Sequence, residues 1–301
     1  MRVLRTPDSA FEGLAEYPFA PRWSVVADAR LGPLRMHYLD EGPDDGPSIL
    51  LLHGEPSWSY LYRRMIPLLV GAGFRCLAPD LVGFGKSDKP AATSDYSYAW
   101  HVAWLSEWFE QMALRDVTLF CQDWGGLLGL RLVAAYPDRF ARVMASNTFL
   151  PTGDSPISPG FLRWRDFSQS VSVLPVGGII QGGTARGITA AVRAAYDAPF
   201  PDERYKAGAR VFPTLVPTRP DDAESEANRI AWRVLEDWHK PFLTAFGDSD
   251  AVMAGADREF QARIPGARGQ RHVTIAAAGH FSQEDAGAEL AEVLLGLMTT
   301  A

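Results

Sequence analysis

The fold is decided by Val117-Thr118-Leu119-Phe120-Cys121-Gln122-Asp123-Trp124-Gly125-Gly126. The first five residues of this stretch predict a buried strand, and those from Gly125 onward predict a helix that ends before Pro137. Asp123 therefore lies in a sharp strand-to-helix turn, and a side chain that protrudes from such a turn needs small residues two positions before and after it. Cys121 and Gly125 meet that need. The positive end of the helix favours a carboxylate at this point, although an aspartate here is also a common helix N-cap.

Strands and helices alternate on both sides of this turn, which predicts a mostly parallel sheet covered by helices. We expect eight strands, at residues 23–27, 34–39, 49–53, 75–79, 117–121, 142–145, 242–246 and 272–275, the first two as an antiparallel hairpin. Helices are expected at residues 59–70, 98–112, 125–136, 223–238, 258–264 and 284–298. Between residues 150 and 222 the alternation gives way to frequent prolines and the glycine group Gly177, Gly178, Gly182 and Gly183. The sequence thus predicts one core, residues 1–149 and 223–301, interrupted by a helical cap at residues 150–222.

Composition excludes several classes of partner. The chain has 301 residues, with 29 Lys and Arg against 36 Asp and Glu, and a formal charge of −7. Such a surface offers no basic cluster for nucleic acid or anionic lipid, and no apolar run is long enough to span a bilayer. Cys76 and Cys121 are too few for a disulfide framework and lie in predicted strands. Because the N-terminal segment also lacks the layout of a secretory signal, we expect a cytoplasmic protein without nucleic-acid or membrane partners.

An acid and a histidine follow Asp123 in the chain order expected of a catalytic triad at such a turn. Two aspartates, Asp248 and Asp250, come after the strand predicted at residues 242–246. We prefer Asp250 as the acid, since Asp248 fits a residue that holds the turn. His280 follows the last predicted strand, at the carboxyl edge of the sheet where open α/β folds bind ligands. Asp123, Asp250 and His280 are therefore the candidate catalytic residues.

The motifs around these residues resemble the haloalkane dehalogenases of the α/β-hydrolase superfamily over nearly the whole chain. The matching stretches are His53-Gly54-Glu55-Pro56-Ser57-Trp58, Asp80-Leu81-Val82-Gly83-Phe84-Gly85-Lys86-Ser87-Asp88, Gln122-Asp123-Trp124-Gly125-Gly126, Gly247-Asp248-Ser249-Asp250 and Gly279-His280-Phe281. The resemblance implies an α/β-hydrolase fold and an oxyanion hole made by the backbone N–H groups of Glu55 and Trp124. It also implies halide binding by the indoles of Trp124 and Trp164, with Phe161, Phe212 and Pro213 lining the substrate pocket. One branch of the family carries its acid as glutamate where this chain has Asn147, which supports Asp250.

The resemblance implies hydrolysis of a haloalkane to a primary alcohol, halide and a proton, with water as co-substrate and without metal or cofactor. A carboxylate is already ionised at neutral pH, so Asp123 needs no base in order to attack carbon. His280 would instead activate the water that hydrolyses the resulting ester. Two alternatives stay open: an epoxide hydrolase, which would take a proton from cap tyrosines such as Tyr196 or Tyr205, and a catalytically silent binding protein. Neither the physiological substrate nor the oligomeric state follows from the sequence.

Overall fold

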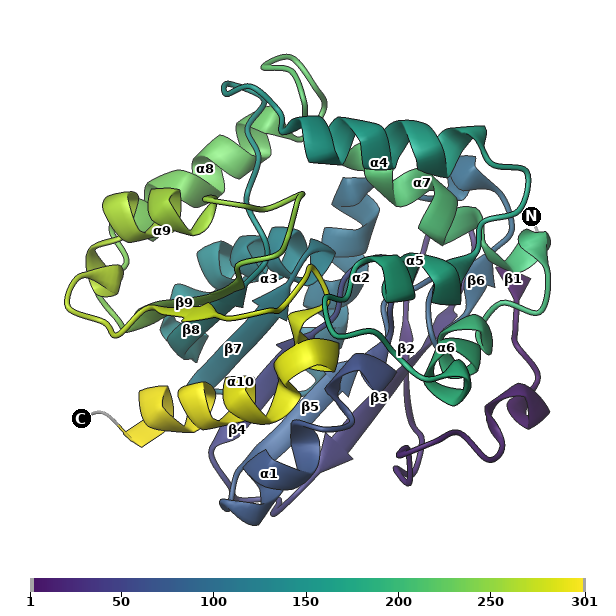
Figure 1. Ribbon diagram of the computed structural model, residues 1–301, viewed down its shortest axis with the longest axis horizontal. Coiled ribbons are helices and arrows are strands. Elements are labelled where there is room, and N and C mark those ends of the chain that lie inside the picture. The colour runs from purple at the N-terminus through teal and green to yellow at the C-terminus, as the bar shows by residue number, and fades with distance from the viewer. Residues whose placement is uncertain (1–2, 300–301) are drawn as a thin grey trace.

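A computed structural model describes residues 3–299 and shows a central sheet with helices on both faces (Figure 1). The eight strands are β2 (Arg22–Val26), β3 (Leu34–Glu41), β4 (Ser48–Leu52), β5 (Arg75–Pro79), β7 (Val117–Gln122), β8 (Phe140–Ser146), β9 (Phe242–Gly247) and β10 (Val273–Ile275). Their order is β10-β9-β8-β7-β4-β5-β3-β2. The β2–β3 and β3–β5 pairs are antiparallel and the other pairs are parallel. The predicted fold class is confirmed, whereas the small sheet of β1 (Val3–Leu4) and β6 (Lys89–Pro90) was not expected.

Two layers of helices cover the sheet (Figure 1). One face carries α1 (Ile66–Gly71) and α10 (Ser282–Thr299), and the other carries α2 (Tyr98–Gln111), α3 (Trp124–Ala135) and α8 (Ser225–Glu236), while α9 (Asp257–Arg263) packs beside β9. Between β8 and α8 the chain forms α4 (Pro159–Ser170), α5 (Val176–Gly182), α6 (Ala190–Asp197) and α7 (Ala207–Leu215). Figure 1 shows these four helices gathered on one side of the sheet. Short 3-10 helices span Asp8–Phe11, Ser59–Tyr62, Thr93–Asp95, Pro137–Arg139, Glu203–Tyr205 and Pro265–Ala267.

The single helix predicted at residues 59–70 is wrong. The chain instead forms the 3-10 helix Ser59–Tyr62 and then α1, which begins at Ile66. Pro67 explains the break, because proline has no N–H to donate to the carbonyl four residues earlier and its ring clashes with that carbonyl. The proline is tolerated in the first turn of α1, where the amides have no helical partner.

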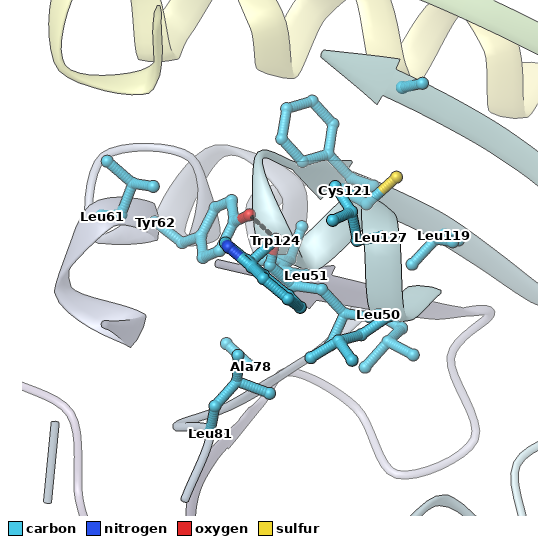
Figure 2. Close-up of a cluster of buried hydrophobic side chains, with 14 of the residues drawn as sticks. Leu50, Leu51, Leu61, Tyr62, Ala78, Leu81, Leu119, Cys121, Trp124 and Leu127 are labelled. Carbon is cyan, nitrogen blue, oxygen red and sulfur yellow. Dashed lines mark hydrogen bonds between the residues drawn. The ribbon is translucent and has the colours of Figure 1, made fainter. Parts of the chain in front are cut away.

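The core lies between the sheet and its helices. Figure 2 shows part of it, where Leu50, Leu119 and Cys121 from β4 and β7 come together with Tyr62 and Trp124. The hydroxyl of Tyr62 donates to Leu52 O at 2.6 Å, which satisfies a buried polar group within this apolar region. Cys121 and the other cysteine, Cys76 in β5, are both free and fully buried. They are packing residues, as the sequence predicted.

The carboxyl ends of β4, β7, β8 and β9 meet at one edge of the sheet, because these neighbouring strands run parallel. Each strand is followed there by a residue that the sequence analysis discussed: Gly54 and Glu55 after β4, Asp123 after β7, Asn147 after β8 and Asp250 after β9. Polar side chains from distant parts of the sequence are thereby brought to one place. Within residues 3–299, no helix combines the length and apolar character that crossing a membrane requires.

Candidate active site

Asp123 occupies a strained turn between β7 and α3. Its backbone has φ 52° and ψ −128°, a conformation that a residue with a side chain adopts at a cost of about 1–3 kcal/mol. The turn is held by Asp123 N–H, which donates to Asn147 O at 3.1 Å, and by the hydroxyl of Thr148, which donates to Asp123 O at 2.6 Å. A Cβ on Gly125 would lie 2.0 Å from Leu52 O, so only glycine fits there. This explains the small residue that the sequence places two positions after Asp123.

The structure brings Asp123, Asp250 and His280 together. His280 Nδ1 lies 2.8 Å from Asp250 Oδ2, and His280 Nε2 lies 3.3 Å from Asp123 Oδ2. Asp250 is buried, and its other oxygen accepts the backbone N–H groups of Val252 and Met253 at 2.7 and 3.2 Å. His280 itself is anchored through its carbonyl, which accepts the side-chain amide of Gln122 at 3.0 Å. Asp248, the other candidate acid, hydrogen-bonds through its side chain to its neighbour Ser249.

Sequence reasoning considered Asn147 only as a departure from one family branch and missed its contact with Asp250. The Asn147 side chain donates to Asp250 Oδ2 at 2.8 Å and accepts the N–H of Gly247 at 3.0 Å. It therefore bridges the ends of β8 and β9 and fixes the acid that orients His280. The available signal was an amide residue directly after a strand that lies between the strands of the nucleophile and the acid.

The peptide between Gly54 and Glu55 aims a hydrogen-bond donor at Asp123. The Glu55 N–H donates to Asp123 Oδ1 at 2.7 Å. On the other side of the same peptide, Gly54 O accepts His53 Nδ1 at 2.9 Å and both the hydroxyl and the N–H of Ser57 at 2.9 and 3.0 Å. Because hydrogen bonds in a chain polarise one another, these contacts strengthen the Glu55 donor as well as fixing it. A Cβ on Gly54 would lie 2.2 Å from Asp123 Oδ1, so this approach also requires glycine.

The Glu55 side chain is buried, and its surroundings favour the neutral form. Burial raises its pKa well above the usual value, and the nearby charge of Asp123 raises it further. Its Oε1 atom is buried without a hydrogen-bond partner among residues 3–299, and the residue lines the cavity described below. A neutral acid at this point adds no second negative charge beside Asp123.

His280 and Asp250 form a charged pair. Burial alone would lower the pKa of His280, but the carboxylates of Asp250 and Asp123 outweigh burial and raise it well above 6.5. Burial would likewise raise the pKa of Asp250, but His280, Asn147 and the Val252 N–H outweigh burial and lower it to about 2. The two carboxylates therefore favour the cationic form of the ring.

A cavity of about 810 Å³ opens over Asp123 beneath helices α4–α7. Its lining includes Glu55, Trp124 and His280 from the core and Phe161, Trp164 and Pro213 from α4 and α7. Part of the glycine group noted in the sequence, Gly178, Gly182 and Gly183, also lines it. Most of the lining is apolar, which suits an uncharged organic ligand. No group of His, Cys, Asp or Glu within the described chain is arranged to hold a metal ion.

Five of the six residues that the resemblance indicated for the pocket, the halide site and the oxyanion hole line this cavity, and Phe212 is the exception. Phe212 is fully buried and is not among the residues lining the cavity. Its ring stacks on Trp124 with ring centroids 4.4 Å apart, and Tyr98 packs edge-on against the same indole with centroids 5.0 Å apart. The expectation that Phe212 lines the pocket is thus corrected: it supports Trp124 from behind. Trp124 follows Asp123 directly and lies at the positive end of α3.

The two cap tyrosines of the epoxide hydrolase alternative lie elsewhere. Tyr196 is fully buried, and its hydroxyl donates to Glu284 Oε1 in α10. Neither Tyr196 nor Tyr205 is among the described residues that line the cavity. The cap tyrosines that would supply the proton in that alternative are therefore absent from the part of the cavity wall that the structure describes.

Comparisons with known proteins agree with this geometry. Residues 47–287 match the model of the alpha/beta hydrolase fold family. The chain is 58% identical to a haloalkane dehalogenase from Psychrobacter cryohalolentis, over 98% of this chain and 97% of the relative, and 56% identical to one from Mycolicibacterium paratuberculosis, over 98% of both chains. The tetrameric structure of haloalkane dehalogenase DpaA from Paraglaciecola agarilytica superimposes with a TM-score of 0.93 at 38% identity and covers 100% of both chains. The chain belongs to the haloalkane dehalogenases, hydrolases of the α/β-hydrolase fold that act on carbon–halide bonds.

Proposed function

We propose that this chain converts haloalkanes to primary alcohols through a covalent ester between the substrate's alkyl group and Asp123. The observation that carries the proposal is the division of labour between the two Asp123 oxygens. Oδ1 accepts the Glu55 N–H, whereas Oδ2 lies toward His280, in a cavity lined mostly by apolar groups. One oxygen is thereby available to attack carbon while the other is held in place.

In the first step Oδ2 attacks the carbon that bears the halogen, a C–O bond forms and the C–halogen bond breaks. The electron pair leaves with the halide, which needs hydrogen-bond donors rather than a proton. The indole N–H groups of Trp124 and Trp164 supply these donors in our proposal, since both residues line the cavity. The neutral Glu55 side chain and the positive end of α3 also favour an anion there.

In the second step a water attacks the ester carbonyl carbon and His280 takes its proton. Esterification makes this possible, because it removes the Asp123 charge that helps to keep the ring protonated. The pKa of His280 then falls, the ring releases its proton to solvent, and the neutral imidazole acts as base while Asp250 orients it. Collapse of the tetrahedral intermediate breaks the bond between the carbonyl carbon and the alkyl oxygen. The alcohol leaves with the proton held by His280, and the acid formed on Asp123 ionises.

The Glu55 N–H belongs to the oxyanion hole in this scheme, together with the N–H of Trp124. Oδ1 becomes the carbonyl oxygen of the ester and carries the negative charge of the tetrahedral intermediate. Losing one such donor typically costs about 2.7–4 kcal/mol in the transition state. The 2.7 Å contact from Glu55 to Oδ1 supports this role, because the donor is in place before the reaction begins.

We further propose that residues 150–222 act as the cap that closes the site. Support comes from α4 and α7, which contribute Phe161, Trp164 and Pro213 to the cavity wall. The volume lies in the range of pockets that bury drug-sized ligands, so substrates longer than two carbons fit. A cytoplasmic location is part of the proposal, supported by two buried free cysteines that need no oxidising compartment.

Intact mass spectrometry of His280→Ala tests the ester. With 1-bromobutane, we expect one equivalent of bromide and a stable butyl adduct on Asp123, because displacement does not need the base and hydrolysis does. Asp123→Ala is the matched control and should form neither. Bromide release by His280→Ala without an adduct on Asp123 would contradict the mechanism.

The wild-type protein separates dehalogenation from epoxide hydrolysis. A panel of bromoalkanes should give halide and protons without added metal or cofactor, whereas styrene oxide should give no diol above background. Diol formation from styrene oxide without halide release from the bromoalkanes would contradict dehalogenation and favour an epoxide hydrolase.

A further inference from the structure

Two buried acids, Glu284 and Asp285, follow His280 four and five positions later in the chain, and the proposed chemistry uses neither. Both lie in the first turn of α10 and are almost completely buried. The helix is kinked at Ala286, immediately after them, which separates this first turn from the rest of α10. Burying a charge is expensive unless it is paired or hydrogen-bonded. The partners of the two acids therefore indicate what they do.

Asp285 binds the loop of His280 and the cap at the same time. Its Oδ2 accepts the N–H of Gly279, the residue before His280, at 2.8 Å. The same oxygen accepts the N–H of Ala185 at 2.8 Å, and Oδ1 accepts the N–H of Arg186 at 2.7 Å. Ala185 and Arg186 belong to the cap loop between α5 and α6. One carboxylate thus joins three backbone donors from two distant segments.

The side chain of Arg186 adds further hydrogen bonds between the cap loop and the loop that contains His280. Its guanidinium donates to Ala276 O at 2.9 Å and Ala277 O at 3.2 Å, both in the loop that leads to His280, and to Asp285 O at 2.6 Å. The Phe281 N–H, directly after His280, donates to Gly183 O at 3.2 Å. Residues on both sides of the histidine are therefore attached to the cap loop.

Glu284 also joins α10 to the cap but does not touch the histidine loop with its side chain. It pairs with the buried Arg63 and accepts the hydroxyl of Tyr196 in α6. The two neighbouring acids thus make similar cap-to-core links at different places. This difference allows the effect on His280 to be separated from a general loosening of the cap.

We propose that Asp285, together with Arg186, is a positioning residue for His280 that makes the alignment of the base depend on the cap loop at residues 183–186. The proposal rests on the ester mechanism given above. His280 Nε2 must face the water at the ester carbonyl, and a misplacement of about 1 Å in such geometry costs on the order of a hundredfold in rate. The attack of Asp123 on the haloalkane does not use the base. Loss of the hydrogen bonds that Asp285 and Arg186 make should therefore slow only the second step.

Rapid-quench single-turnover measurements with 1-bromobutane test the proposal on Asp285→Asn. Asparagine keeps the shape of aspartate but presents an NH₂ group to backbone N–H donors. We expect the rate of bromide release to stay within about twofold and the rate of butanol release to fall on the order of tenfold to a hundredfold. The butyl adduct on Asp123 should then accumulate transiently. Arg186→Gln is the second variant, and because Arg186 is exposed this protein should fold even if Asp285→Asn does not.

Tyr196→Phe is the matched control, since it removes a cap-to-α10 hydrogen bond away from the histidine loop. It should leave both rates within about twofold of wild type. The proposal is overturned if Asp285→Asn and Arg186→Gln leave butanol release unchanged, if they slow both steps equally, or if Tyr196→Phe gives the same selective loss. Failure of the ester mechanism would appear separately, as absence of the adduct in His280→Ala.

Discussion

The two side-chain oxygens of Asp123 lie in different environments: Oδ1 accepts the Glu55 N–H, and Oδ2 lies toward His280. At the scale of single residues, the proposed mechanism depends on this difference. Sequence patterns located Asp123, Asp250 and His280 because chain order and the strand-to-helix turn leave a local signature. They did not reveal Asn147 as the support of Asp250, or Phe212 as the support of Trp124. Both contacts join residues 88 or more positions apart, and nothing in the local sequence specifies such a contact.

Trp164 is the residue at which halide binding can be tested. Trp164→Phe keeps an aromatic ring and removes the N–H, and a hydrogen bond to a charged group is worth about 1.5–3 kcal/mol. We expect halide release in a single turnover to slow about 10- to 100-fold. Bromide should also quench tryptophan fluorescence less strongly.

Trp100→Phe is the control for that measurement. Trp100 lies on α2 beneath the guanidinium of Arg30 and is not among the described residues that line the cavity. It should leave halide release unchanged. If both variants release halide more slowly by the same factor, the proposal that Trp164 binds the halide is contradicted.

The two chemical steps should respond differently to pH. In the ester, the pKa of His280 is lower than in the free enzyme, because only Asp250 still opposes the effect of burial. In the proposed mechanism the neutral ring is the active base, so the rate of ester hydrolysis should rise with pH through this lower pKa. Bromide release should be flat over the same range. Single-turnover rates of both products against pH check this, and parallel profiles would contradict it.

At the scale of elements, strands were predicted better than the segments that surround the site. Each of the eight strands was expected because a run of β-branched or leucine residues is a local property. The helix predicted at residues 59–70 is divided because Pro67 lies within it, and this proline was a visible warning in the sequence. The arrangement of α4–α7 over the sheet depends on packing between residues far apart in sequence, so the prolines and glycines indicated only that the regular pattern ends.

The glycines of α5 keep one side of the cavity open. Gly182 is exposed and lines the cavity, and a Cβ placed there meets no atom within 4 Å. Gly182→Trp should therefore narrow this opening without disturbing the fold. We expect kcat/KM for 1-bromohexane to fall severalfold or more, while that for bromoethane changes little.

Gln181→Trp provides the comparison for this variant. Gln181 is the preceding residue of α5, is exposed, and is not among the described cavity-lining residues. Its substitution should leave the ratio of kcat/KM for 1-bromohexane to kcat/KM for bromoethane unchanged. A loss of the same size for both substrates in Gly182→Trp would show that this opening does not select by length.

At the scale of the whole molecule, the contact between Asp250 and His280 contributes to the stability of the fold. The pKa of Asp250 is about 2 in the folded protein and about 3.9 for an unfolded aspartate. A lowered folded pKa stabilises the fold above the unfolded value, and the contribution is lost as pH falls through the folded value. The difference corresponds to about 2–3 kcal/mol at neutral pH, of which roughly half is lost between pH 5 and pH 3.

Urea unfolding of the wild type and of Asp250→Asn at pH 5 and pH 3 measures this contribution. The free-energy difference between the two proteins should shrink by about 1 kcal/mol on acidification. An unchanged difference would mean that Asp250 is not held ionised by its partners.

Overall topology was also the most predictable property at this scale, since one turn and the chain order around it specify the sheet.

The burial of both thiols has a consequence for an enzyme that works among electrophiles. Alkyl halides modify proteins chiefly at thiolates, and exposed cysteines would be consumed by the very compounds the enzyme degrades. Burial raises the pKa of Cys76 to about 12, with a smaller contribution from Glu41, and burial raises the pKa of Cys121 as well. Both sulfurs thus stay protonated and inaccessible. The protein has no cysteine at which its own substrates readily inactivate it, so the proposed nucleophile, Asp123, does not compete with a reactive thiol.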